Sequence, residues 1–247
     1  MATDHPVVCF RLSLYSPTCH HPGVLSARPR PRRRFRNADE SRARILHAAV
    51  AEFAASGYRG ASIGSIALRA GISQSGLLHH FPSKELLLAA VIDLRTSDHL
   101  DEYLAAKADD PELGFMTGMV RLMRRGAREL ELTRLFAVVI AEATSPDHPA
   151  HEWAIRRYET VTQTVVADLR AAQQRELLRS DFDVGAVAAT LLAAMDGLQL
   201  RYLLTPGEPQ IDDALAALAG QMLADLAFDS PRAAAAIGAW RVQHGAR

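Results

Sequence analysis

Helical periodicity from Asn37 onward is the feature that most constrains this chain. Apolar residues recur three or four positions apart, and Ser, Asn or Asp stands where several helices would begin. No alternation of apolar and polar residues lasts long enough to predict a sheet. Gly57, Gly71 and three proline-containing segments would end helices. The sequence therefore predicts an all-α fold.

The segment before these helices has a different character. Residues 1–36 contain five prolines, end in a run of arginine and proline, and show no sustained period. We therefore expect a disordered basic arm there. The predicted helices that follow span about 37–57, 62–70, 73–80, 83–107, 112–128, 130–144, 150–178, 183–204, 211–228 and 231–240.

Charge is unevenly distributed along the 247 residues. Residues 1–84 carry 12 basic and 4 acidic side chains, whereas residues 85–247 carry 16 and 24. A basic N-terminal third joined to an acidic remainder indicates that one part meets a polyanion. Two cysteines cannot form a disulfide scaffold, which favours a reducing compartment. We find no apolar run near the roughly 20 residues that cross a bilayer, so we expect no membrane protein.

Residues 62–80 have the spacing of a helix-turn-helix. Two short helical stretches flank Gly71, which permits a tight turn, and Ser62 and Ser73 can cap them. The small core expected between them consists of Ile63, Ile66, Ala67, Ile72, Leu77 and Phe81. The second stretch then presents outward a set of short or hydrogen-bonding side chains, which suits a helix in the major groove of DNA. These are Gln74, Ser75, Gly76, Leu78 and His79.

Residues 61–91 resemble the signature of the TetR family. The matching features are Ile66-Ala-x-x-Ala-Gly-Ile-Ser73, the junction His80-Phe-x-Ser-Lys-Glu85 and the preceding Gly57-Tyr58. The resemblance implies a helix-turn-helix DNA-binding domain at 37–82 and a helical ligand-binding and dimerisation domain at 83–247. It also implies a homodimer that represses a promoter until a small molecule binds.

The expected DNA contacts combine chemistry with this resemblance. Gln74 can pair with a base edge, and helix N-termini at serines bind phosphate readily. Lys84 opposes the dipole of its helix, which a nearby phosphate would explain. The full set of expected contacts is Arg36, Ser62, Ile63, Gly64, Ser73, Gln74, Ser75, Gly76, Leu78, His79, His80 and Lys84.

Two positions depart from the family pattern, and one segment stays open. Ala61 stands where threonine is frequent, and Leu78 where tyrosine is frequent, so we expect His79 or His80 to replace the tyrosine contact. The arginine cluster at 28–36 is either a solvated tail or an arm that enters the minor groove.

No metal or other cofactor is expected. The cysteines and histidines between residues 9 and 21 lack zinc-site spacing, and His148-x-x-His151-Glu has no third ligand nearby. We interpret 148–151 as a helix-capping loop with a solvated histidine. Adjacent His79 and His80 point about 100° apart on a helix and cannot easily share an ion.

The C-terminal part offers candidate pocket and interface residues. The expected pocket lining is large and apolar: Phe115, Met116, Met119, Met123, Phe136, Trp153, Tyr158 and Met195. Few charges fall on the apolar faces, so we expect a largely apolar effector. Asp196 and Arg201 could orient a ligand or bind across a dimer seam. Two apolar stripes are the expected dimer interface: Val187, Leu191, Ala194, Leu198 and Tyr202, and Leu215, Leu218 and Met222.

We therefore expect a cytoplasmic, ligand-responsive transcriptional regulator, a repressor that binds a near-palindromic operator of double-stranded DNA as a homodimer. An architectural DNA-binding protein without sequence preference is the alternative. An all-α enzyme is disfavoured, because we find no paired nucleophile and base, no phosphate-binding glycine loop and no metal-ligand set.

Overall fold

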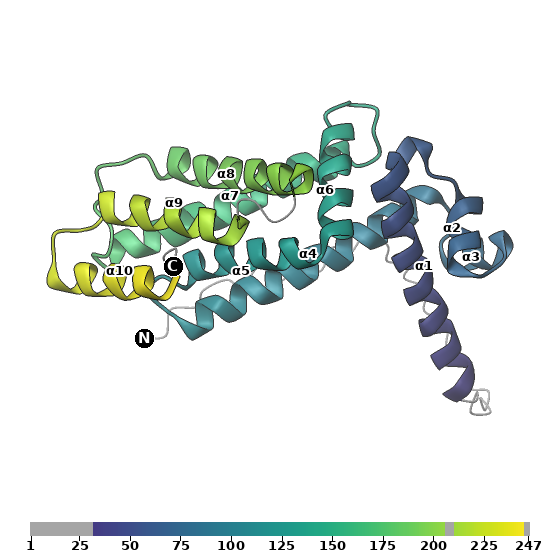
Figure 1. Ribbon diagram of the computed structural model, residues 1–247, viewed down its shortest axis with the longest axis horizontal. Coiled ribbons are helices and arrows are strands. Elements are labelled where there is room, and N and C mark those ends of the chain that lie inside the picture. Colours follow the sequence, from purple (N-terminus) through teal and green to yellow (C-terminus); the bar gives the residue numbers. More distant parts are fainter. Residues whose placement is uncertain (1–31, 206–209, 245–247) are drawn as a thin grey trace, which may run out of the picture.

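The computed structural model describes residues 32–205 and 210–244, with side chains from residue 39 onward. Every regular element among them is an α-helix, which confirms the predicted class (Figure 1). The helices are α1 (Arg32–Gly60), α2 (Ile63–Ala70), α3 (Gln74–His80), α4 (Lys84–Asp109), α5 (Gly114–Arg128), α6 (Leu130–Glu142), α7 (His151–Gln174), α8 (Val184–Leu204), α9 (Ile211–Asp225) and α10 (Pro231–His244).

The first helix begins earlier than the sequence predicted. α1 starts at Arg32, so the prediction of a disordered arm is wrong for residues 32–36. Arginine is a good helix former, and proline is tolerated at a helix start, so Pro31 does not prevent the helix from extending back to it. The remainder of the predicted arm, 1–31, lies outside the described residues.

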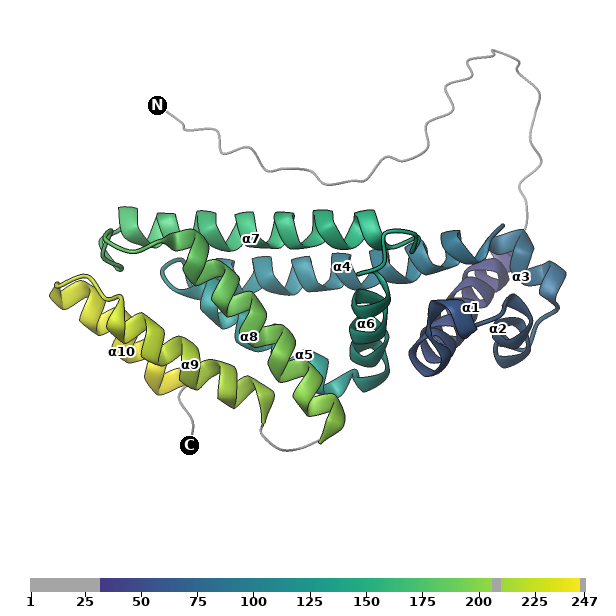
Figure 2. The same cartoon turned by 90° about the horizontal axis from the view of Figure 1, so that it is seen from above.

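The molecule is elongated, with α1, α2 and α3 at one end and α10 at the other (Figure 1). α4 starts beside the first three helices and continues into the body, where α5 packs along it. α6 stands between α1 and the rest of the bundle in both views (Figure 2). A hydrogen bond of 2.6 Å from the Tyr103 hydroxyl to Asp168 ties α4 to α7.

Two hydrophobic cores divide the chain, and the division does not follow the order of the helices. One core contains residues of α1, α2, α3, the first half of α4 and also α6. The other is built around α5, whose Phe115, Met116, Met119 and Met123 are buried against α7, α8, α9 and α10. α6 therefore packs with the N-terminal helices although it lies far along the sequence.

α8 is more apolar than the sequence analysis allowed. It is the one described helix whose length and mean hydropathy of 1.2 suffice to cross a membrane, so the statement that no such run exists was wrong. Most of α8 is not buried within the chain: only Ala188, Leu191 and Met195 are. Packing within the chain therefore does not explain the apolar character of the exposed face of α8.

Candidate DNA-binding surface and its connections

Serine caps fix the start of each short helix in the helix-turn-helix. Ser62 Oγ accepts a hydrogen bond of 3.0 Å from the Ser65 amide, and Ser65 Oγ accepts one of 3.2 Å from the Ser62 amide. Ser73 Oγ accepts from the Gly76 amide at 3.0 Å at the start of α3. Between the two helices Gly71 adopts φ +67°, a left-handed conformation that suits glycine. The turn and caps thus set the angle between α2 and α3.

The core beneath these helices is largely the predicted one. Ile66, Ala67, Leu77 and Phe81 are buried, and they pack with residues of α1 such as Phe53. Ile63 and Ile72, which were expected in the same core, are only partly buried at its edge. The packing leaves one side of α3 without protein contacts.

Most of the expected DNA contacts lie on that side. Gln74, Ser75, Leu78 and His79 are exposed on α3, and Ser62, Gly64 and Ser73 are exposed at the helix starts. Ile63, Gly76 and His80 are partly buried. A β-carbon built on Gly64 would lie 3.9 Å from Gln74 Oε1, so the starts of α2 and α3 are adjacent. The side chain of Arg36 lies outside what the structure describes.

Lys84 makes contacts within the chain that the sequence did not predict. Its Nζ donates hydrogen bonds to the carbonyls of Tyr58 at 2.8 Å and Ala61 at 3.0 Å, and it lies 4.4 Å from the centre of the Tyr58 ring. These carbonyls, at and just beyond the end of α1, attract a cation. This placement explains the lysine without invoking a phosphate.

Two arginines beside the helix-turn-helix were missed. Arg42 stacks over the Phe81 ring at 4.4 Å, and an Arg44 nitrogen would lie 3.7 Å from a β-carbon on Gly71. Both are exposed residues of α1; Arg44 brings positive charge to the α2–α3 turn, and Arg42 brings it to the end of α3. The sequence places both arginines three or four residues before buried residues of the same helix. Only the folded structure shows that this part of α1 lies beside α2 and α3.

A polar junction joins the end of α1 to the end of α6. The Tyr58 amide donates a hydrogen bond of 2.8 Å to Glu142, and the Tyr58 hydroxyl donates one of 2.6 Å to Glu85 at the start of α4. That second bond holds the pKa of Glu85 below its usual value. Gly57 has φ +69°, and a β-carbon there would lie 2.5 Å from Glu142 Oε1. The DNA-facing helices are thus held by both α4 and α6.

His148 completes this junction, and the prediction of a solvated histidine there was wrong. Its side chain is buried, its Nδ1 accepts a hydrogen bond of 3.1 Å from the Ala150 amide, and its Nε2 lies 3.6 Å from Glu142 Oε2. Burial lowers the pKa of His148, while Glu142 partly opposes that shift. No cluster of three potential metal ligands occurs among the described residues.

The expected pocket residues do not form one group. Phe115, Met116, Met119, Met123 and Met195 lie in the core around α5, whereas Phe136 and Trp153 pack in the core of the N-terminal helices. Tyr158 is exposed, and its hydroxyl donates a hydrogen bond of 2.6 Å to Asp196.

The expected interface residues mostly face inward. Leu191 and Leu215 are buried in the chain's own core. Of these residues only Leu218 is well exposed. Val187, Leu198, Tyr202 and Met222 are partly buried against the core, and Ala194 is partly buried.

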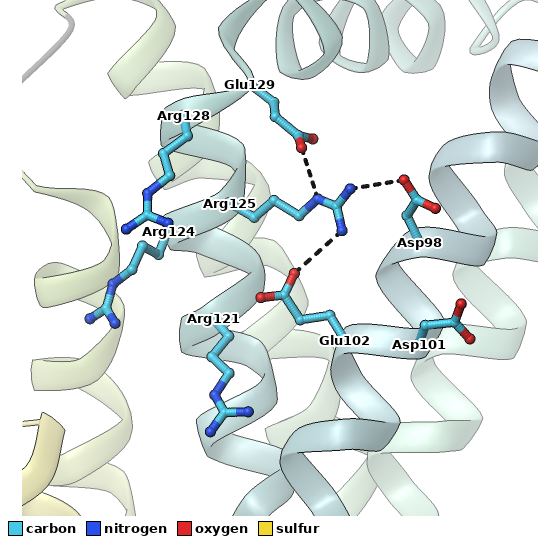
Figure 3. Close-up of a pocket in the computed structure, with 8 residues that line it drawn as sticks. All are labelled: Asp98, Asp101, Glu102, Arg121, Arg124, Arg125, Arg128 and Glu129. Carbon is cyan, nitrogen blue, oxygen red and sulfur yellow. Dashed lines mark hydrogen bonds and ion pairs between the residues drawn. The ribbon is translucent and has the colours of Figure 1, made fainter. Parts of the chain in front are cut away.

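A charged pocket of about 700 Å³ lies between α4 and α5 (Figure 3). In it Arg125 binds three carboxylates, those of Asp98 at 2.8 Å, Glu102 at 3.6 Å and Glu129 at 3.0 Å. These pairs raise the pKa of Arg125 against the opposing effect of burial. Arg125 therefore joins the α4 carboxylates to the turn between α5 and α6.

Two family profiles match the chain. Residues 45–91 match the profile described as bacterial regulatory proteins, tetR family, and residues 118–227 match the one described as BetI-type transcriptional repressor, C-terminal. The chain is also 27% identical over 181 residues to the HTH-type transcriptional regulator TtgR of Pseudomonas putida, an alignment that covers 71% of this chain and 86% of that protein.

Solved structures share the fold. A transcriptional regulator from Saccharomonospora viridis, crystallised with choline, superposes with a TM-score of 0.61 at 25% identity, over 76% of this chain and 95% of that one. The SmeT–triclosan complex superposes with a TM-score of 0.66 at 20% identity, over 77% of this chain and 93% of that one.

Proposed function

This chain belongs to the TetR family of bacterial transcriptional regulators, and we propose that it is a dimeric repressor that leaves its operator when a small molecule binds. The proposal rests above all on α3, which is held by caps and a buried core while Gln74, Ser75 and His79 face outward. A regulator of this kind acts where the DNA is, which places it in the bacterial cytoplasm.

We propose that the exposed side of α3 contacts the bases of the operator. Gln74 offers an amide that can bind an adenine edge through two hydrogen bonds, and Leu78 offers an apolar surface to a thymine methyl. The capped starts of α2 and α3 supply amides for phosphates, and Arg42 and Arg44 supply charge. Lys84 donates two hydrogen bonds to carbonyls of its own chain, and its predicted contact with a phosphate would use the remaining N–H.

The exposed face of α8 supports dimerisation. Ala189, Ala193, Gly197, Leu200 and Leu204 are exposed at steps of three or four residues and form one stripe. Small side chains allow a helix of a second chain to approach closely, and a β-carbon on Gly197 would have no atom within 4 Å in one chain. We propose this stripe, together with Leu218 of α9, as the centre of the dimer seam, beside the partly buried residues predicted from sequence. Two such chains would place two α3 helices on successive major grooves, about 34–36 Å apart.

Release requires a path from the effector to α3. We propose that α4 and α6 provide it together, because both touch the end of α1: Glu85 through the Tyr58 hydroxyl and Glu142 through the Tyr58 amide. The two α3 helices of a dimer can lie at more than one separation. An effector that binds the dimer better at one of these separations shifts the population toward it. The two relatives crystallised with small molecules support a ligand-responsive role for this chain.

The test is fluorescence anisotropy of the full chain on labelled DNA from its own upstream region, against an unrelated duplex and across salt concentrations. We expect a preference of about a thousandfold near physiological salt. Gln74→Ala should weaken binding by about 1–3 kcal/mol and relax preference at one base position. Gln163→Ala, an exposed glutamine of α7, is the matched control. Binding that ignores sequence in every duplex and collapses with salt would support an architectural DNA-binding protein instead.

A further inference from the structure

Arg95 is a buried cation that forms no ion pair with a carboxylate among the described residues. The residue is 3% exposed, and its guanidinium lies 4.0 Å from the centre of the Phe136 ring. One nitrogen donates a hydrogen bond of 2.8 Å to the carbonyl of Leu132, but the buried Nε–H has no acceptor. An unsatisfied buried donor on a charged group is costly, so its retention needs a reason.

A second guanidinium lies close by. Arg157 of α7 is 5.9 Å from the centre of the same Phe136 ring and 6.0 Å from that of Trp153, and it is partly buried. Among the described residues it has neither a hydrogen bond nor an ion pair. Because both cations lie against one ring, no more than about 10 Å separates their central carbons.

The nearby carboxylates are already engaged. Asp196 accepts a hydrogen bond from Tyr158, and Glu129 is paired with Arg125. The clustered arginines change the pKa values of Arg95 and His99. Burial first, and Arg157 second, lower the pKa of Arg95 to about 9, and burial together with these arginines lowers the pKa of His99 to about 3. Glu129 and Asp196 oppose the lowering of the Arg95 pKa without cancelling it.

We propose that Arg95 and Arg157 form the recognition site of the effector, and that the effector is an organic carboxylate with an aromatic or aliphatic body. This rests on the proposed function, since it names the ligand class of the same regulator. The guanidinium fork matches a carboxylate, which would accept the orphaned Nε–H, and Trp153 beside Arg157 is only partly buried, which leaves apolar surface for the rest of the molecule. The largely apolar ligand expected from sequence is thereby replaced by an amphipathic anion.

The same geometry disfavours a quaternary ammonium ligand. Such cations bind on the faces of aromatic rings, and here Arg95 and Arg157 already lie against Phe136 and Trp153. A third positive charge would also be repelled. Choline is therefore an informative negative probe for this chain.

The site is placed where its occupancy can reach the DNA-binding helices. Arg95 of α4 binds the Leu132 carbonyl near the start of α6, and Glu142 at the end of α6 binds the Tyr58 amide of α1. An anion that draws Arg95 toward Arg157 would change the hold of α4 on α6.

Calorimetric titration of the full-length protein with phenylacetate, benzoate and decanoate tests the proposal. Phenylacetamide and choline serve as neutral and cationic probes. We expect at least one carboxylate to bind, with phenylacetamide and choline at least about tenfold weaker. Arg157→Gln should weaken the carboxylate by about tenfold or more, whereas Arg156→Gln, its exposed neighbour paired only with Glu152, should not. Binding by none of the three carboxylates, or equal binding of the amide or choline, overturns the proposal.

A second measurement does not depend on the choice of probe. If Arg157 serves a ligand and not the fold, Arg157→Met removes a desolvated charge without an ion pair and should leave the melting temperature of the ligand-free protein unchanged or raise it. A lower melting temperature would assign Arg157 a structural role and overturn the proposal.

Operator binding is measured separately by anisotropy, so that failure of the proposed carboxylate site can be distinguished from failure of the proposed repressor function. Carboxylate binding that leaves operator affinity unchanged supports the anion site and contradicts effector-driven release. Operator binding without any carboxylate binding contradicts the anion site alone.

Discussion

Gly57 is the residue at which the DNA-facing helices meet the rest of the chain. Its φ of +69° and ψ of 174° fall in a region that only glycine adopts readily, and Glu142 fills the space where a β-carbon would lie. One position thus combines a conformational and a steric requirement. Gly71 has the same sign of φ but open surroundings, since its nearest neighbour would be 3.7 Å away.

This pair of glycines gives a matched prediction. Gly57→Ala should lower the free energy of unfolding by about 1–3 kcal/mol through backbone strain, and further because Glu142 must move from the Tyr58 amide. Gly71→Ala should cost about 1–2 kcal/mol from strain alone. Urea denaturation of both variants measures the difference. Equal losses would mean that Glu142 moves aside freely and does not constrain the junction.

His99 should make stability depend on pH. The groups that hold its pKa at about 3 are the buried surroundings and Arg95, Arg157 and Arg125. An unfolded histidine has a pKa near 6.5, so folding keeps the ring neutral, and its contribution is fully present above about pH 6.5. Below that pH the unfolded chain binds the proton first, and stability falls by about 1.4 kcal/mol per pH unit.

Thermal melts between pH 7.5 and 5.0 check this dependence. His99→Gln should flatten the decline, whereas His47→Gln, at an exposed position on α1, should not. A decline that persists unchanged in His99→Gln would assign the effect to other groups.

Lys84 shows what a sequence can and cannot reveal about a residue. The cation on the first turn of a helix opposes the helix dipole, and the sequence prediction accounted for it with a nearby phosphate. Its partners, the carbonyls of Tyr58 and Ala61, lie 26 and 23 residues away and become visible only once α1 and α4 are packed. Arg95 and Arg157 were missed for the same reason, since nothing in their local sequence brings α4 and α7 to one ring.

At the scale of elements, local signals predicted the helices well. Caps at Ser62, Ser73 and Ser83 and the turn at Gly71 set the boundaries of α2, α3 and the start of α4 within a residue. The ends without such signals were less accurate: α7 stops at Gln174 where the pattern continued to about 178, and α10 extends to His244. Apolar spacing continues past the point where the backbone turns, because Leu177 and Leu178 are buried in the loop itself.

α4 and α5 approach each other closely at Gly114. A β-carbon on Gly114 would lie 2.4 Å from the Ala106 carbonyl oxygen and 2.8 Å from Lys107 Cα, which are backbone atoms that cannot rotate away. Gly114→Ala should therefore destabilise the protein by about 1–3 kcal/mol. Gly238→Ala is the control, because nothing lies within 4 Å of that position in α10, and alanine should add about 0.5–1 kcal/mol there. Chemical denaturation compares the two, and a neutral Gly114→Ala would mean that α5 can shift along α4.

At the scale of the whole molecule, the sequence predicted two functional parts but not how they share a core. α6 was expected to belong with the ligand-binding helices, yet its Leu135, Phe136 and Val139 pack with α1 and α4. The predicted pocket was divided between two cores for that reason. Periodicity gives the apolar face of a helix but not the partner that covers it.

The proposed dimer seam can be tested on the same scale. Ala193→Glu places a charge in the exposed stripe of α8 and should convert a dimer into single chains, with operator affinity lost in parallel. Val242→Glu is matched to it, because Val242 is an apolar residue that is 89% exposed, but on α10. Light scattering after size exclusion gives the masses. A dimer that survives Ala193→Glu and dissociates in Val242→Glu would place the seam on α10.

The separation between the α8 stripe and α3 has a consequence for genetics. If α8 forms the proposed dimer seam, a mutant allele that damages α3 but keeps α8 intact still produces chains that pair with normal ones, and a mixed pair holds one half-site only. When both alleles are expressed equally and pairing is random, about three quarters of all pairs contain a damaged chain. Lesions in α3 should therefore be dominant over the normal copy, whereas lesions in the α8 stripe should be recessive.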